Sequence, residues 1–274
     1  MGIVNVTPDS FSDGGCWFDH GRAITHGEDL IAQGADIVDV GGESTRPGAQ
    51  PVPEEEELRR VLPVIEALAG RTTVSIDTRK ARVATAAIAA GATVLNDVSS
   101  SLFEVAAAGG AGWVAMHARA DPTTMNAHAH YDDVVAEVRD HLVACAEQAR
   151  AAGVERVWID PGIGFAKTAA HNLSLLRHLD ELVETGWDVT VGTSRKSFLG
   201  PLSVRPGQPP APAAERVEAS VATAVWAITQ GAAMVRVHDV VAVAAAVRLA
   251  GPSTPPAPAA PIGSPLAGTR GERR

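Results

Sequence analysis

Short apolar segments recur eight times along the chain, and most are bounded by Gly, Asp, Ser or Pro. Within them apolar and polar positions do not alternate, which is typical of strands buried on both faces of a parallel sheet. We therefore expect eight buried strands. They lie at Gly2–Val6, Ala35–Val40, Thr73–Ile76, Thr93–Asn96, Trp113–Met116, Arg156–Ile159, Asp188–Val191 and Ala233–Val237.

The stretches between these segments are rich in Ala and amphipathic, as expected of helices that cover a sheet. The clearest ones are Gly21–Gln33, Pro53–Leu68, Arg79–Ala89, Tyr131–Ala151 and Ala170–Thr185. Strand and helix thus alternate eight times, without a linker long enough to separate two domains. This alternation predicts an α/β fold, a closed (β/α)8 TIM barrel, rather than an open doubly wound sheet.

Two Pro-rich segments fall outside this plan. Pro201–Ala214 carries five prolines between the seventh strand and its helix, and we expect a long loop at the mouth of the barrel. Residues 252–274 are rich in Pro, Ala and Gly and have no periodic apolar face, which predicts a disordered tail. The expected organisation is one barrel domain over residues 1–251, followed by the tail.

The last predicted helix, Asp239–Ala250, is apolar on nearly all of its faces. An outer barrel helix needs only one apolar stripe, so its other faces are expected to bury against a second copy of the chain, most simply in a homodimer. The alternative is an Ala-rich helix whose small exposed side chains cost little. The pattern alone leaves both interpretations open.

Composition narrows the classes of protein. Of the 274 residues, 46% are hydrophobic and 20% charged, which is typical of a globular chain. The apolar runs are shorter than the roughly 20 residues that span a membrane, and the first residues do not resemble a secretion signal, so a cytoplasmic protein is expected. A net charge of −9 gives no general attraction to nucleic acid or anionic lipid. An anionic partner would need a local basic pocket.

Polar residues follow nearly every predicted strand. In a TIM barrel the carboxyl ends of the strands surround a single active-site mouth, so these side chains are expected to converge there. One polar residue after a strand is ordinary turn chemistry, whereas eight in succession indicate a site. The residues are Asn5, Asp39, Glu43 to Arg46, Asp77, Asn96, Asp97, Met116, His117, Asp160, Ser194 to Ser197, Arg236 and His238.

Their chemistry divides them into two groups. Asp77, Asn96 and Asp160 can pair with the N–H groups of a flat heterocycle, Lys196 can donate to a ring carbonyl or nitrogen, and Met116 offers a polarizable flank. The second group has donors for a phosphate or diphosphate and an amide oxygen for a hard cation. Its members are Asn5, Arg46, Arg236 and His238.

Three other features admit alternative functions. The Gly-rich loop over residues 160–168 lacks the Gly-Lys-Ser/Thr ending of a P-loop, which disfavours nucleoside triphosphate binding. Lys196 could form a Schiff base, as in barrel aldolases, although its neighbours Arg195 and Ser197 favour a set of ligand donors. His128 and His130 are spaced for a metal but have no preceding Cys or carboxylate, so a solvated pair is expected.

The order and placement of eight motifs resemble the dihydropteroate synthase family, the folate-pathway enzymes that sulfonamides target. The resemblance covers residues 2 to about 240, and it is specific because all eight motifs fall in order at the expected strand ends. The motifs begin at Asn5 (NVTPDSFSDGG), Asp39 (DVGGESTRPG), Ser75 (SIDT), Asn96 (NDVS), Met116 (MH), Asp160 (DPGIGF), Ser194 (SRKS) and Arg236 (RVH).

The resemblance implies that 6-hydroxymethyl-7,8-dihydropterin diphosphate condenses with 4-aminobenzoate, giving 7,8-dihydropteroate and diphosphate. By analogy, the pterin residues are Asp77, Asn96, Met116, Asp160, Phe165 and Lys196, and the diphosphate residues are Asn5, Thr45, Arg46, Arg236 and His238. The aminobenzoate residues are Phe11, Pro47, Lys196 and Ser197, and the ligands of the implied Mg²⁺ are Asn5 and Asp13. The catalytic set is Asp77, Asp160, Lys196, Arg236 and His238.

The implied chemistry is loss of diphosphate, assisted by Mg²⁺, followed by attack of the aniline nitrogen on a pterin methylene cation. The competing interpretation from another class is a catalytically idle relative that binds pterins. Retention of every ligand-type residue favours the enzyme.

Overall fold

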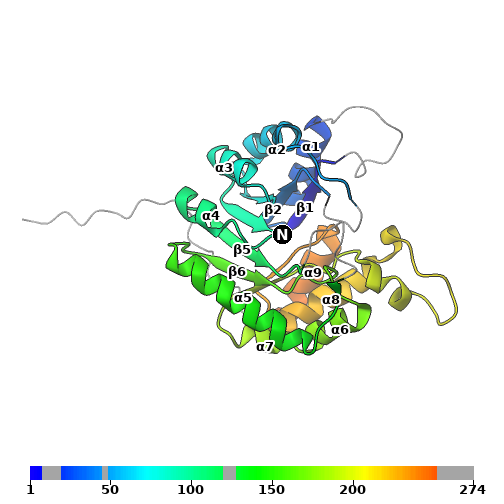
Figure 1. Cartoon of the computed structure of the whole chain (residues 1–274). Helices are drawn as coiled ribbons and strands as arrows, with labels where there is room; N and C mark the ends of the chain where they lie inside the picture. Colours follow the sequence, from blue (N-terminus) through cyan, green and yellow to red (C-terminus); the bar gives the residue numbers. More distant parts are fainter. Residues whose placement is uncertain (8–19, 45–48, 120–127, 252–274) are drawn as a thin grey trace, which may run out of the picture.

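The computed structural model describes residues 1–7, 20–44, 49–119 and 128–251. Within these ranges it confirms the predicted barrel, in which eight parallel strands lie in sequence order (Figure 1). The barrel closes beyond β8, where Gly2 bridges Val237 in parallel and the Ile3 N–H donates to the Val237 carbonyl at 3.1 Å. The strands are β1 (Gly2–Asn5), β2 (Ile37–Gly41), β3 (Thr73–Asp77), β4 (Val94–Asp97), β5 (Gly112–Met116), β6 (Val157–Asp160), β7 (Asp188–Val191) and β8 (Met234–Val235).

Helices follow the strands and surround the barrel (Figure 1). They are α1 (His20–Ala32), α2 (Glu54–Leu68), α3 (Ala81–Ala89), α4 (Phe103–Gly109), α5 (Val134–Ala151), α6 (Ala169–Arg177), α7 (Leu179–Val183), α8 (Val217–Thr229) and α9 (Val240–Ala250). The predicted Pro-rich loop before α8 contains 3₁₀ turns at Pro201–Ser203 and Ala213–Glu215, after another at Ser197–Leu199. The predicted disordered tail, residues 252–274, lies outside the described residues.

Two helix predictions differ from the structure. Helix α5 begins at Val134 rather than Tyr131, because the Asp133 side chain accepts hydrogen bonds from the next backbone N–H groups and caps the helix there. The single helix expected over residues 170–185 is two helices, α6 and α7, which meet at His178. The sequence does not reveal this break, because the helical spacing of buried apolar residues continues across it. Leu175 before the break and Leu179 after it are both fully buried.

The register of the strands places the polar end residues side by side. Asn5 pairs with Gly41, Gly41 with Asp77, and Asp77 with Asn96, so three neighbouring strand pairs end at one level. On the other side of the barrel, Met116 pairs with Asp160. The sheet itself therefore collects these side chains at one mouth.

Apolar side chains form part of the layer below that mouth. Side chains two positions apart on a strand face the same side of the sheet, so the residues two positions before Asn96, Met116, Asp160 and Arg236 also point inward. These residues form one buried cluster with Met1. The inward-pointing members of the cluster are Val94, Val114, Trp158 and Met234. The same layer also contains the buried polar residues Asp39, Ser75 and Thr190.

Helices α8 and α9 pack against each other and leave large apolar side chains on the surface. Trp226 is 45% exposed, Val241 61% and Leu249 89%. In the ranges that the structure covers, no helix has the length and apolar character needed to cross a membrane.

Candidate active site

A cavity opens at the carboxyl ends of the strands. It contains side chains from most of the barrel strands and from the segments that follow them, as the convergence of strand ends predicted. Eight predicted site residues line it: Asp77, Asn96, Met116, Asp160, Phe165, Lys196, Arg236 and His238. The remaining lining residues are Ile3, Val98, Gly162, Ile163, Gly192 and Ser194.

Arg236 lies at the centre of a charged cluster at the base of this cavity. Its Nε donates to Asp39 Oδ2 at 2.6 Å and its Nη2 donates to Asp77 Oδ2 at 2.7 Å. Asn96 Nδ2 donates to the same Asp39 oxygen at 3.0 Å. Asp39 thus orients two lining side chains from below, while Asp77 stays in contact with the cavity.

Burial shifts the protonation of the lining groups toward their neutral forms. It raises the pKa of Asp77 to about 7, against the opposing charge of Arg236, and it also raises the pKa of Asp160. Burial lowers the pKa of Lys196 to about 8. A carboxyl group and an ammonium group that titrate near neutral pH, such as those of Asp77 and Lys196, are typical of functional sites when they lie in a cavity.

Lys196 and Phe165 form one wall of the cavity. The Lys196 ammonium lies 4.1 Å from the centre of the Phe165 ring, which is the geometry of a cation–π contact. Gly164 makes this approach possible, because a Cβ at that position would lie 3.0 Å from the Lys196 Cδ. The wall therefore presents an aromatic face and a donor together, which suits a flat polar ring.

His238 lies at the rim, where Ser194 fixes its position. The Ser194 Oγ is 3.0 Å from His238 Nδ1 and accepts the His238 backbone N–H at 3.1 Å. This leaves Nε2 as the ring nitrogen directed away from Ser194. Arg236 and His238 come from the same strand end, as their spacing predicted, and they provide cationic and polar donors for an anion.

The remaining predicted residues do not all reach the cavity. Asn5 ends β1 beside Gly41, and Ser197 begins a 3₁₀ turn next to Lys196. Arg195, expected as a ligand donor, forms an ion pair with Asp239 at 2.5 Å and does not line the cavity. His128 and His130 are exposed, and no cluster of three potential metal ligands occurs in the described ranges. Phe11, Asp13, Thr45, Arg46 and Pro47 lie outside the described residues.

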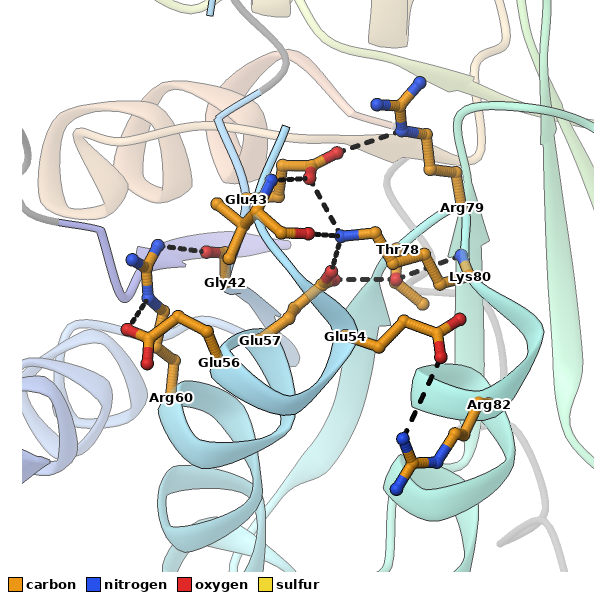
Figure 2. Close-up of polar contacts among 11 residues, drawn as sticks. Gly42, Glu43, Glu54, Glu56, Glu57, Arg60, Thr78, Arg79, Lys80 and Arg82 are labelled. Atoms are coloured by element: carbon orange, nitrogen blue, oxygen red, sulfur yellow. Dashed lines mark hydrogen bonds and ion pairs between the residues drawn. The ribbon is translucent and has the colours of Figure 1, made fainter. Parts of the chain in front are cut away.

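A buried ion network stands behind the ends of β2 and β3 (Figure 2). Lys80 Nζ contacts the carboxylate of Glu57, donates to Glu43 Oε2 at 2.8 Å and donates to the Val52 carbonyl at 2.6 Å. Glu43 in turn accepts the Val52 N–H at 2.7 Å. Burial opposes ionisation of Glu43, yet the hydrogen bonds from Lys80 and Val52 lower its pKa. The network joins residue 43 to residue 52 and ties both to α2 and β3.

Three structurally important residues were given no role by the sequence. Asp39 and Ser194 were expected to converge at the mouth with the other polar residues, but only the closed barrel brings Asp39 to Arg236 and Ser194 to His238. Lys167 lies in the Gly-rich loop, where its buried contacts depend on the folding of that loop. The feature of the sequence that could have pointed to Lys167 is the scarcity of lysine, since the chain has only three lysines.

Comparison with known proteins gives consistent matches. Residues 1–238 match the family described as pterin binding enzyme. The dihydropteroate synthase of Synechocystis sp. is 46% identical over 253 residues, covering 89% of this chain and 86% of that protein. The Xanthomonas albilineans dihydropteroate synthase with 4-aminobenzoic acid superposes with a TM-score of 0.83 at 46% identity, covering 90% of each chain. The Thermus thermophilus dihydropteroate synthase in complex with 6HMPPP superposes with a TM-score of 0.77 at 43% identity, covering 91% of each.

Proposed function

The chain belongs to the dihydropteroate synthases, within the family of pterin binding enzymes, and from this premise we propose how its cavity joins two substrates. The substrates are 6-hydroxymethyl-7,8-dihydropterin diphosphate and 4-aminobenzoate, and the products are 7,8-dihydropteroate and diphosphate. The protein is thus a transferase of folate biosynthesis. The observation that carries the assignment of the cavity is the ring of carboxylate, amide and ammonium groups around one flat hollow.

The pterin occupies this hollow edge-on to its polar side chains. Asp77, Asn96 and Asp160 pair with the ring N–H groups and Lys196 donates to the ring carbonyl or a ring nitrogen. The aromatic face of Phe165, held 4.1 Å from the Lys196 ammonium, supplies the stacking surface. A ring that lacked matching donors and acceptors would leave these buried polar side chains without hydrogen-bond partners, which would weaken its binding. The pattern of polar side chains therefore selects a heterocycle with matching groups.

The diphosphate lies at the rim, against Arg236 and His238. The C–O bond between the pterin methylene and the diphosphate breaks, and its electron pair leaves with the diphosphate, whose charge these two residues stabilise. The positive charge left on the methylene is stabilised by ionised Asp77. The lone pair of the aniline nitrogen then forms the new C–N bond, and the nitrogen releases its proton to solvent. A weak nucleophile suffices because the electrophile is already cationic.

The family also implies Mg²⁺, and Asn5 is the described residue that fits it. Its Oδ1 lies 3.8 Å from the position that a Cβ on Gly41 would take, so the glycine leaves space beside this amide oxygen. Amide oxygens, phosphate oxygens and water are ligands that Mg²⁺ accepts. Asn5 would hold the ion, together with Asp13 of the undescribed segment. When bound, it would supply charge neutralisation at the leaving diphosphate.

The 4-aminobenzoate site adjoins Lys196 and Ser197 at the same mouth. We assign Phe11 and Pro47, from segments outside the described residues, to its other side. With 4-aminobenzoate in this position, Lys196 contacts both substrates, and the amine therefore lies near the pterin methylene that it attacks.

We also propose a homodimer through α8 and α9. Trp226, Val241 and Leu249 form an apolar surface on two adjacent helices, which is the kind of face that a second copy covers. Light scattering at micromolar concentration should show a dimer, and Leu249→Asp should give a monomer. A monomeric wild-type protein would contradict this assignment. A cytoplasmic location stays a prediction from the sequence.

The reaction is tested by incubating the full chain with both substrates and Mg²⁺ and measuring dihydropteroate and diphosphate. Equal amounts of both products are expected. A folded protein that binds the pterin but forms no product would identify the catalytically idle relative instead. Reductive trapping by borohydride of an aldehyde or ketone compound on Lys196 would instead favour the Schiff-base chemistry of a barrel aldolase, and Lys196→Met is the control for that trapping.

A further inference from the structure

Lys167 is a half-buried lysine that lies beside the cavity without lining it. Its Nζ donates to the carbonyls of Phe165 and Gly162, both at 3.1 Å, and to the His117 carbonyl at 3.3 Å. It is also 2.9 Å from His117 Nδ1. Within the part of the chain that the structure describes, it forms no ion pair. Its ammonium is therefore used to bind backbone carbonyls rather than a carboxylate.

These carbonyls come from two loops that both supply cavity residues. His117 follows Met116 at the end of β5, whereas Gly162 and Phe165 belong to the loop after β6. The loops approach so closely that a Cβ on Gly162, whose φ is +62°, would lie 1.9 Å from the His117 oxygen. Carbonyl dipoles that converge in this way repel one another. The N–H donors of Lys167 at their centre offset this repulsion, although desolvation lowers the pKa of Lys167 to about 7.

The imidazole of His117 completes the arrangement as an acceptor. Burial lowers the pKa of His117 to about 2, so the ring is neutral at physiological pH. A neutral imidazole can carry its proton on Nε2 and accept at Nδ1, which is the nitrogen that faces Lys167. Four acceptors thus surround one ammonium group.

The rest of the loop is held by directional hydrogen bonds. Asn172 of α6, 2% exposed, accepts the Gly164 N–H at 2.8 Å, and Asp160 Oδ1 accepts the Gly162 N–H at 2.7 Å. The Phe165 N–H donates to the Gly162 carbonyl at 3.0 Å. Lys167 is the tether in this set that joins the loop to the adjacent strand end. Phe165 and Ala166 of the loop also pack with Met116 in a buried apolar cluster, so removing the Lys167 donors would loosen the loop on β5 rather than detach it.

We propose that Lys167 is a positioning residue for the pterin site, which clamps the loop after β6 onto the end of β5 and so fixes the Phe165 ring beneath Lys196. The inference rests on the proposed function, because it assigns the clamped wall to the pterin. Lys167 acts through Phe165 and Gly162 and does not itself touch the substrate. It is therefore distinct from the residues assigned to the chemistry.

Lys167→Met tests the clamp, because methionine keeps the length of the side chain and removes all its N–H donors. In the substrate-free protein, hydrogen exchange over residues 160–166 should become at least tenfold faster. The KM for the pterin substrate should rise about tenfold or more, while kcat falls less. Calorimetric affinity for the pterin substrate, measured without 4-aminobenzoate, should fall by the same factor as the KM rises.

Leu142→Ala is the matched control for general destabilisation. Leu142 on α5 is fully buried and lies in the main core, away from the cavity lining. This variant should lower the melting temperature without changing pterin affinity or exchange over residues 160–166. If Lys167→Met does not fold, Lys167→Gln, which keeps two N–H donors, should show smaller changes in the same direction.

The outcomes separate the clamp from the function on which it rests. Unchanged exchange and unchanged pterin affinity in a folded Lys167 variant would overturn the clamp, as would an equal loss of affinity in Leu142→Ala. Faster loop exchange in a protein whose wild type binds no pterin would overturn the assigned pterin role and the proposed function, while showing that Lys167 does hold the loop.

Discussion

The Nε of Arg236, at the end of β8, donates to Asp39 at 2.6 Å, a residue in the middle of β2 and almost two hundred positions earlier in the chain. The same guanidinium binds Asp77, and although burial opposes its charge, the neighbouring carboxylates of Asp39 and Asp77 raise the pKa of Arg236 above its ordinary value. Arg236 is therefore fully charged and has a fixed orientation before any substrate arrives. Such preorganised charge is an efficient way to stabilise an anionic leaving group.

Asp39→Asn should keep the shape of this cluster and remove one of its charges. Arg236 and Asn96 would lose their shared anionic acceptor, so kcat/KM should fall about 10- to 100-fold, equivalent to about 1.4 to 2.7 kcal/mol. The Asp39 charge also raises the pKa of Asp77, so the acid limb of the pH profile should move to lower pH. A profile with an unmoved acid limb would contradict the coupling. Circular dichroism and melting confirm that the variant folds.

The pH dependence of kcat/KM should be bell-shaped. The proposed active form has an ionised Asp77 and a protonated Lys196. Burial raises the pKa of Asp77 to about 7 and lowers the pKa of Lys196 to about 8, so activity should fall below about pH 7 and above about pH 8. Initial rates at substrate concentrations well below KM measure this profile. A kcat/KM that stays constant from pH 6 to 9 would show that neither the ionisation of Asp77 nor that of Lys196 controls the reaction rate.

Lys196→Met should abolish turnover while leaving the fold intact. Because the folded-state pKa of Lys196 is depressed to about 8 from 10.5, the unfolded chain binds more protons between these pH values. The free energy of unfolding of the wild type should therefore rise with pH across this window, by up to about 3 kcal/mol from this residue.

The variant should lack this contribution, and denaturant unfolding at pH 7 and pH 10 measures the difference. Parallel pH dependence in the two proteins would contradict the burial of the charge. Normal turnover by the variant would remove Lys196 from the proposed site.

Lys80→Met should destabilise the fold far more than an exposed ion pair would. It leaves the Glu57 carboxylate, 1% exposed, without its cation, while Glu43 keeps Arg79 at 2.9 Å, and loss of a buried partner costs about 3–5 kcal/mol. Arg82→Met is the matched control from the same region (Figure 2), since Arg82 is 56% exposed where it meets Glu55. The control should cost at most about 1 kcal/mol. Urea unfolding compares them, and equal costs would refute the buried network.

The sequence determined the architecture of this protein. Non-alternating segments such as Val157–Asp160, with helices between them, leave few ways to bury eight apolar strands, and the closed barrel is the one that covers both faces of each. Polar residues directly after the strands then have to converge, because parallel strands end at a common edge. Asp77, Asn96, Asp160 and Lys196 were found on this ground, before any coordinates.

Only the tertiary structure decided how those side chains are used. The pairing of Arg236 with Asp39 depends on barrel closure, and the diversion of Arg195 to Asp239 depends on where the β7 loop passes α9. The helix break at His178 and the Lys167 clamp depend equally on contacts between segments distant in sequence. Local patterns specify which residues are buried, because burial follows periodicity. Which groups form hydrogen bonds depends on their lying within a few ångströms of each other, and those distances are set only when the chain folds.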